Sequence, residues 1–334
     1  MSIKAYAAMA AKETLQRFEY DPGPLGPHEI EVAVEYCGIC HSDVHVIDND
    51  WMNGVYPLVP GHEVVGKVTR IGEHVSYVKV GQRVGIGWQC NSCGTCEWCG
   101  IGEEPLCSQN QATCVGHHGG FAQSVRANER FAFPLPEGMK SENAAPLLCG
   151  GITVYSPLRL YSVQPHHRVG VVGIGGLGHM AVQFANAMGC EVTAFSTSAG
   201  KADEARRLGA HEFVVNTDPD ALKAQTGKLD FILVTAFAPL DWSAYVAMLR
   251  PHGKLCFVGA VLQPVSVSAF DLLLGYKSIC GSAIGGRTLI TEMLDFAARN
   301  DVQAMTEVMP MDRCNEALAK VRNNTARYRM VLKN

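Results

Sequence analysis

The sequence lacks several features that define whole classes of protein. Among its 334 residues, no apolar run reaches membrane-spanning length free of glycine and polar breaks. No block of like charges occurs and the net charge is −4, which argues against a polyanion-binding tail or a disordered segment. The apolar run before Lys12 is too short for a secretory signal. We therefore expect a cytoplasmic protein with no nucleic-acid and no membrane partner.

Length and hydrophobic pattern predict two domains, because a chain of this size exceeds the usual single core. Residues 1 to about 150 contain short β-like runs, such as 30–34 and 64–68, separated by Gly and Pro turns. From there on, short apolar runs alternate with helical patterns, which predicts an α/β domain with a doubly wound, parallel Rossmann sheet. The tail contains two helical segments, 292–298 and 315–321, and a strand, 328–332, that we expect to rejoin the first domain. The predicted domains are 1–149 with 288–334, and 150–287.

The sequence contains thirteen cysteines, which is many for its length and an odd number. We therefore expect free thiols and metal-binding cysteines, and not disulfides. Four follow the spacing C-x2-C-x2-C-x7-C, which supplies enough sulfur for a tetrahedral zinc. They are Cys93, Cys96, Cys99 and Cys107. A nucleic-acid-binding zinc ribbon is the rival interpretation, but no Lys or Arg lies between Cys90 and Asn110. We predict a structural zinc here and interpret Cys90 and Cys114 as small apolar fillers.

A second set of zinc-type ligands is spread over two short motifs and one further cysteine. Thiolates and imidazoles suit zinc, and three protein ligands with an open position present the metal to a substrate. We predict Cys40, His62 and Cys149 as these three ligands. Two thiolates and one neutral imidazole leave the site formally neutral, so it can polarise a carbonyl without trapping an anion.

Polar residues beside this set suggest a route for the alcohol proton. Ser42 would accept it and pass it through the cofactor ribose to His45. Asp43 would receive the free N–H of His62 and fix its tautomer. Glu63, next to His62, would either orient the metal ligands without binding the metal itself or bind the metal transiently.

A glycine motif, G-x-G-x-x-G, lies between a predicted strand at 169–172 and a predicted helix. Its residues are Gly173, Ile174, Gly175, Gly176, Leu177 and Gly178. The first glycine permits a tight turn, the second lets the backbone approach a pyrophosphate, and the third lets the helix pack on the strand. A turn without a ligand is the alternative, which the strand–loop–helix context disfavours.

The end of the next predicted strand bears on the choice of nicotinamide cofactor. An NAD site usually has Asp or Glu there, but this strand ends in Ser196 and Thr197, with no acid until Asp203. Hydroxyls can donate to a 2′-phosphate and Lys201 can supply charge, so NADP is favoured. The Ser and Thr residues can equally cap the following helix, and both roles are compatible.

Taken together, these motifs resemble the zinc-dependent medium-chain alcohol dehydrogenases, and most closely the cinnamyl alcohol dehydrogenase branch with its bacterial aldehyde reductases. The matching segments are 37–45, 59–63, the four-cysteine lobe, 146–155 and 173–178. The resemblance implies a GroES-like fold for the first domain and a homodimer formed through the cofactor domain. It also implies cofactor contacts: Thr153 and the glycine loop, Ser196, Thr197 and Lys201 at the 2′-phosphate, and His41 and Arg329 near the pyrophosphate.

The resemblance is weaker at the substrate pocket, because between Cys107 and 119–121 the chain is shorter than its relatives in that branch. Trp51, Trp88 and Ile284 are candidate lining residues, with ordinary core packing as the alternative. An apolar pocket would favour aromatic, cinnamyl-type or medium aliphatic aldehydes over sugars. We therefore predict an NADP(H)-dependent alcohol dehydrogenase or aldehyde reductase with two zinc ions per chain. Two alternatives stay open: an NAD-linked polyol or secondary alcohol dehydrogenase, and a zinc-dependent nucleotide-binding protein without turnover.

Overall fold

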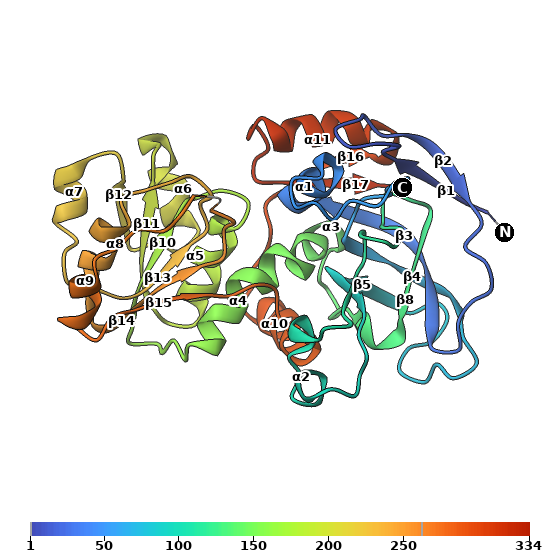
Figure 1. Ribbon diagram of the computed structural model, residues 1–334, viewed down its shortest axis with the longest axis horizontal. Helices are drawn as coiled ribbons and strands as arrows, with labels where there is room; N and C mark the ends of the chain where they lie inside the picture. Colours follow the sequence, from blue (N-terminus) through green and yellow to red (C-terminus); the bar gives the residue numbers. More distant parts are fainter. Residues whose placement is uncertain (1, 262) are drawn as a thin grey trace. The chain divides into compact units, whose positions relative to one another are not determined.

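The computed structural model describes residues 2–261 and 263–334, which form two compact units (Figure 1). Unit 1 comprises Met1–Ile152, Gly285–Arg299 and Gln303–Asn334, and unit 2 comprises Thr153–Ile284 and Asn300–Val302. The chain passes between them after residue 152 and before residue 285, where the sequence suggested 149 and 288. Within the described residues, no helix combines the length and apolar character needed to cross a bilayer.

Unit 2 is built on a six-stranded sheet in which every pair is parallel. The strands are β10 (Arg168–Val172), β11 (Glu191–Ser196), β12 (Glu212–Val215), β13 (Leu229–Val234), β14 (Leu249–Phe257) and β15 (Ser278–Gly281). Their order, β12-β11-β10-β13-β14-β15, is that of the doubly wound dinucleotide fold, so the predicted Rossmann sheet is confirmed. The order reverses at β10, and ligands of such sheets bind beyond the carboxyl ends of the strands at this point.

Helices cover the sheet of unit 2, which explains why strands such as β10 and β13 are mostly apolar along their length. These helices are α4 (Gly150–Leu160), α5 (Gly178–Ala187), α6 (Ala202–Arg207), α7 (Pro219–Lys223), α8 (Trp242–Met248) and α9 (Ala269–Leu273), with the 3₁₀ turn η4 (Ala199–Lys201). Helix α5 packs on β10 and β11, and α8 packs on β14. Phe195, Ile232 and Tyr245 are among the fully buried side chains of this core.

Unit 1 contains a seven-stranded sheet in the order β16-β17-β3-β4-β5-β9, with β8 also pairing with β3. The strands are β3 (Glu29–Ile39), β4 (Glu63–Ile71), β5 (Arg83–Ile86), β8 (Ser124–Asn128), β9 (Ala132–Pro134), β16 (Thr306–Pro310) and β17 (Arg329–Lys333). All pairs are antiparallel except β16 with β17. The last strand, β17, pairs Met330 with Ile39 of β3, so the prediction that the tail rejoins the first domain is confirmed.

Smaller elements surround this sheet. Two short sheets join β1 (Ile3–Ala7) to β2 (Gln16–Tyr20) and β6 (Gln89–Asn91) to β7 (Gln111–Ala112). The helices are α1 (His41–Asp48), α2 (Glu97–Gly100), α3 (Ser141–Ala144), α10 (Arg287–Arg299) and α11 (Cys314–Arg322), with 3₁₀ turns η1 (Glu104–Leu106), η2 (Glu129–Phe131), η3 (Ala145–Leu148) and η5 (Met311–Arg313). The register that pairs Gly38 of β3 with Glu63 of β4 sets the end of β3 beside the start of β4, and η3 packs on both strands. Cys40, His62 and Cys149 immediately flank these three elements.

Candidate functional site

The structure brings the three predicted zinc ligands together with Glu63. One ligand atom from each of Cys40, His62, Glu63 and Cys149 lies within 4.8 Å of the others. The Sγ atoms of Cys149 and Cys40 are 3.9 Å apart. His62 is fully buried, and its Nε2 has no hydrogen-bond partner among the residues that the structure describes. A buried nitrogen without a partner, set among thiols, fits a zinc ion, because buried polar atoms otherwise find partners.

The protonation of the two thiols supports the same interpretation. The thiol of Cys149 donates to Cys40, which lowers the pKa of Cys40 well below its usual value and raises that of Cys149 well above it. Of the two sulfurs, that of Cys40 is therefore the one favoured as thiolate, and that of Cys149 is the one favoured as the protonated donor. A divalent cation would displace that remaining proton, as metal binding at thiol sites requires.

Asp43, in the first turn of α1, holds the far side of the His62 ring. Its Oδ1 accepts from His62 Nδ1 at 3.0 Å and from the backbone N–H of Gly61 at 2.9 Å, and its Oδ2 accepts from the backbone N–H of Cys40 at 2.9 Å. The predicted contact between Asp43 and His62 is confirmed. This hydrogen bond leaves Nε2 as the nitrogen that faces the sulfurs.

Glu63 forms a buried ion pair with Arg329, and the two side chains are 0% and 5% exposed. Burial raises the pKa of the Glu63 carboxyl to about 7, with Arg329 opposing the rise. One carboxylate oxygen accepts from Arg329, and the other, Oε2, has no hydrogen-bond partner in the described part of the chain. No local motif predicts this pair, because it depends on β17 lying beside β3. The predicted contact of Arg329 with a pyrophosphate stays a prediction.

The two residues of the predicted relay, Ser42 and His45, both lie on α1, Ser42 near its start and His45 in its last turn. The thiol of Cys40 lies 3.5 Å from Ser42 Oγ, and His45 Nδ1 is 2.8 Å from Asp50 Oδ2. Asp50 is not among the site residues predicted from the sequence. Asn49 ends α1 in the left-handed conformation, with φ of 59°, and so turns Asp50 back to His45. An Asn just before an acid at a helix end is the signal that would have found it.

Two of the predicted pocket residues lie against the cluster. The ring of Trp88 is 4.8 Å from that of His62 at an angle of 82°, and Trp51 is 6.2 Å from Trp88 and 5.1 Å from His45. Both indoles are half-buried. Ile284 belongs to unit 2, where it is half-buried, and its pocket role stays a prediction.

The four-cysteine lobe is also assembled, since one sulfur from each of its cysteines lies within 4.8 Å of the others. Backbone N–H groups point at these sulfurs: those of Thr95 and Cys96 lie 3.5 and 3.3 Å from Cys93 Sγ. These two donors lower the pKa of Cys93 to about 6. Four clustered sulfurs with backbone donors match a closed structural zinc site.

The glycine loop connects β10 to α5 as predicted. Gly173 has φ of +92°, and a Cβ on Gly178 would lie 1.8 Å from the carbonyl oxygen of Gly173, so neither position tolerates a side chain. A Cβ on Gly175 would meet no atom within 4 Å, which leaves room there for a ligand. Lys201 Nζ donates to the carbonyl oxygen of Ile174 at 2.6 Å, so this predicted 2′-phosphate residue lies at the loop.

The remaining predicted cofactor residues are placed as follows. Ser196 is buried at the end of β11, and its Oγ accepts from the backbone N–H of Ser198 at 3.3 Å, while Thr197 is exposed. Thr153 is buried in α4 of unit 2. His41, the first residue of α1, lies with its ring 5.4 Å from that of His45.

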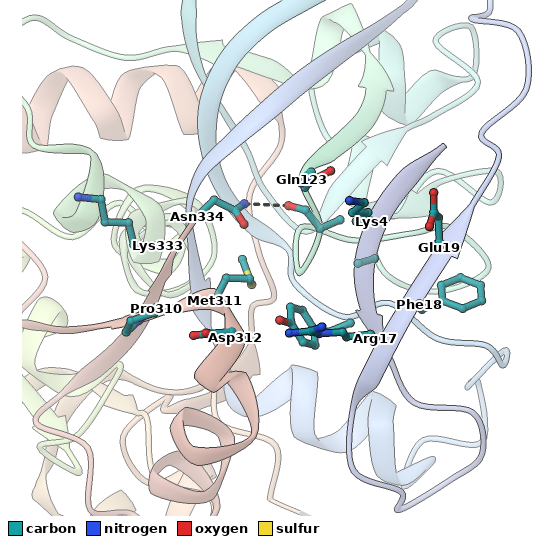
Figure 2. A pocket seen from close by; sticks show the side chains of 13 residues that line it. Lys4, Arg17, Phe18, Glu19, Gln123, Pro310, Met311, Asp312, Lys333 and Asn334 are labelled. Atoms are coloured by element: carbon teal, nitrogen blue, oxygen red, sulfur yellow. Dashed lines mark hydrogen bonds between the residues drawn. The ribbon is translucent and has the colours of Figure 1, made fainter. Parts of the chain in front are cut away.

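A separate groove of about 690 Å³ lies in unit 1 between the β1–β2 hairpin and the end of β17 (Figure 2). Basic Lys4 and Arg17 and acidic Glu19 and Asp312 line it, and Asn334 donates to the carbonyl oxygen of Ala122 at its edge. None of the predicted site residues belongs to this lining. We therefore assign the chemistry to the cysteine–histidine cluster and not to this groove.

Comparison with known proteins agrees with this geometry. The family model "Alcohol dehydrogenase GroES-like domain" matches residues 26–137, and "Zinc-binding dehydrogenase" matches residues 176–299. Aldehyde reductase AdhA of Synechocystis sp. is 49% identical over 330 residues, covering 99% of this chain and 98% of that protein. The chain belongs to the zinc-binding medium-chain alcohol dehydrogenases. This alcohol dehydrogenase interconverts alcohols and aldehydes, and it falls in the cinnamyl alcohol dehydrogenase and aldehyde reductase branch.

Two solved structures resemble the whole alcohol dehydrogenase chain. A cinnamyl alcohol dehydrogenase from Sorghum bicolor superposes with a TM-score of 0.95 at 40% identity, covering 100% of this chain and 98% of the other. A cinnamyl alcohol dehydrogenase from Helicobacter pylori, complexed with NADP(H), gives 0.92 at 32% identity with the same coverage. The predicted combination of a Rossmann domain with a GroES-like domain is thereby confirmed.

Proposed function

We propose that this alcohol dehydrogenase reduces aromatic, cinnamyl-type or medium-length aliphatic aldehydes, and oxidises the corresponding primary alcohols, with NADP(H) as hydride carrier. The absence of an acid at the end of β11 supports NADP, since a carboxylate there would repel a 2′-phosphate. Ser196 and Thr197 at the strand end and Lys201 beside the glycine loop would receive that phosphate. The relative from Helicobacter pylori, which was solved with NADP(H), supports the same choice.

We propose that Cys40, His62 and Cys149 hold the catalytic zinc and that Cys93, Cys96, Cys99 and Cys107 hold a structural one, giving two per chain. The single observation that carries the first assignment is the buried Nε2 of His62, which has no hydrogen-bond partner within residues 2–261 and 263–334. When bound, the metal would polarise the oxygen of the substrate. Glu63, held by Arg329 beside the cluster, would bind it transiently.

The residues around this centre would move the proton and position the cofactor. Ser42 would exchange a proton with the substrate oxygen, and His45, oriented by Asp50, would carry it to and from water through the cofactor ribose. Residues 173–178 and Thr153 would bind the dinucleotide. His41 and Arg329 would lie toward the pyrophosphate.

Trp51 and Trp88 would present flat apolar faces to the substrate, with Ile284 as a further candidate, which favours aldehydes over polyols. We further propose that unit 2, predicted as 150–287, binds the dinucleotide and that the remainder, 1–149 with 288–334, carries the catalysis, in a cytoplasmic homodimer. Apolar side chains on and beside α9 support dimerisation through unit 2. Phe270, Leu273, Leu274 and Tyr276 are each at least 65% exposed.

The proposal is tested by mixing the purified protein with NADPH and cinnamaldehyde or benzaldehyde and following the nicotinamide absorbance. Oxidation of NADPH is expected, and His62→Ala should abolish it in a folded protein, whereas His166→Ala should not. No oxidation across a broad aldehyde panel would favour a binding protein without turnover. Faster turnover of polyols with NAD would favour the polyol dehydrogenase alternative.

A further inference from the structure

A third group of metal-type side chains lies on the far side of His62. Asp43, His62 and Cys114 are each 0% exposed, and one polar atom from each lies within 4.8 Å of the others. The sulfur of Cys114 is 3.8 Å from His62 Nδ1. This group does not fit a second metal, because both oxygens of Asp43 already accept from His62, Gly61 and Cys40. The thiol therefore needs another explanation than metal binding.

We propose that Cys114 is a positioning residue for His62, and this inference rests on the proposed role of His62 as a ligand of the catalytic zinc. Three side chains enclose the imidazole: Asp43 accepts its Nδ1 proton, Trp88 packs edge to face at 4.8 Å, and Cys114 fills the space beside Nδ1. The second torsion of a histidine side chain is soft and broad, so packing must fix the ring orientation. The sulfur is the part of this enclosure that stops the ring from turning away from Asp43.

The loop that carries Cys114 is fixed on both sides of it. Before it, Thr113 donates its backbone N–H to the carbonyl of Trp88 at 2.8 Å and its hydroxyl to the carbonyl of Gly87 at 2.6 Å. After it, the backbone N–H of Gly120 donates to the carbonyl of Gly61 at 2.8 Å. The segment between the four-cysteine lobe and residue 119 is therefore held next to His62 by these hydrogen bonds. The place of the sulfur is set by this backbone and not by its own side-chain rotamer alone.

The test measures release of the catalytic zinc from the purified holoenzyme to a chromophoric chelator, in parent, Cys114→Ala, Cys114→Ser and Cys90→Ala proteins. Cys90→Ala is the matched control, because Cys90 is a buried thiol of the same region that donates to the carbonyls of Gln111 and Ala112 and not to His62. Losing a group that orients a metal-bound histidine typically weakens metal binding about 10–100-fold. For a thiol at this distance we expect the lower end of that range, so Cys114→Ala should release zinc about tenfold faster than the parent. The release rate of Cys114→Ser should lie between those of the parent and Cys114→Ala, and that of Cys90→Ala should equal the parent rate.

A second measurement separates positioning from general loosening of the fold. In enzyme whose catalytic zinc is replaced by cobalt, the visible absorption reports the ligand geometry, and it should change in Cys114→Ala but not in Cys90→Ala. Equal zinc release from the parent and Cys114→Ala, or the same acceleration in Cys90→Ala, would overturn the inference. If Cys114→Ala does not fold, Cys114→Ser is compared with Cys90→Ser. Faster zinc release in Cys114→Ser alone would support the inference, and equal release in the two variants would overturn it. A His62→Ala protein that still holds two zinc ions would instead refute the proposed catalytic site.

Discussion

The buried pair of Glu63 and Arg329 leads to a quantitative prediction. Replacing Arg329 by Met keeps an unbranched apolar stem but removes the cation that faces a 0% exposed carboxyl. Breaking a buried ion pair from one side typically costs about 3–5 kcal/mol, because a buried charge is left without compensation. Whole domains are stable by only about 5–15 kcal/mol, so unit 1 of Arg329→Met should be markedly destabilised.

The destabilisation should increase with pH, because a protonated Glu63 is neutral and costs little to bury, whereas an ionised Glu63 would be buried without its cation. Burial raises its pKa from 4.5 to about 7 while Arg329 opposes the rise. Without Arg329 the folded-state pKa moves further up, by about 2–4 units if the full 3–5 kcal/mol is expressed. Above about pH 7 the native variant then holds a proton that the unfolded chain has lost, so its free energy of unfolding falls by about 1.4 kcal/mol per pH unit. In the parent this carboxyl, with a pKa of about 7, completes its ionisation just above pH 7, so its own contribution to the slope fades by about pH 8.

Urea unfolding followed by tryptophan fluorescence measures this difference, because Trp51, Trp88 and Trp98 lie in unit 1 and only Trp242 lies in unit 2. Between about pH 7 and pH 8.5 the gap between parent and Arg329→Met should widen by about 1.5 kcal/mol, because the parent itself loses a little stability as Glu63 finishes ionising. The double variant Glu63→Gln with Arg329→Met has no charge at either of these two positions, so it should recover most of the lost stability and lose the added pH dependence. A gap that is the same at both pH values, or a double variant as unstable as the single one, would refute the reasoning.

Three further changes test the rest of the site. Cys93→Ala should lower the zinc content from two to one per chain, measured by elemental analysis, and lower the unfolding temperature of unit 1, measured by calorimetry. A variant as stable as the parent would exclude a structural role for this cysteine cluster. Ser196→Asp should shift the ratio of NADPH to NADH turnover by about tenfold or more toward NADH, through repulsion of the 2′-phosphate, and an unchanged ratio would mean that the phosphate binds elsewhere. Gly178→Ala would bring a Cβ within 1.8 Å of the Gly173 oxygen and should weaken NADPH binding, measured by fluorescence titration, whereas Gly100→Ala, with no atom within 4 Å, should not.

The hydrophobic pattern predicted most of unit 2 because its strands are covered on both faces. The predicted run 169–172 corresponds to β10 (Arg168–Val172), and 192–195 lies inside β11 (Glu191–Ser196). The pattern failed at β14, which begins at Leu249 although the apolar run begins at residue 255. Residues 250–253 read Arg-Pro-His-Gly, and the register against β13 shifts at this place. A strand that continues through a bulge leaves no continuous apolar run to find.

In the site, too, features set by residues close together in the sequence were predictable, and features set by distant segments were not. Residue type and spacing pointed to both cysteine clusters, since thiols and imidazoles suit zinc wherever the fold gathers them. The partners of these ligands were harder to predict. Asp50 reaches His45 only because Asn49 turns left-handed, and Arg329 reaches Glu63 across 266 residues because β17 pairs with β3 in one register. A shift of β17 by one residue would turn Arg329 to the opposite face of the sheet and leave Glu63 buried without a cation. The charge around the proposed metal centre is thus set partly by a strand register at the far end of the chain, which no local motif encodes.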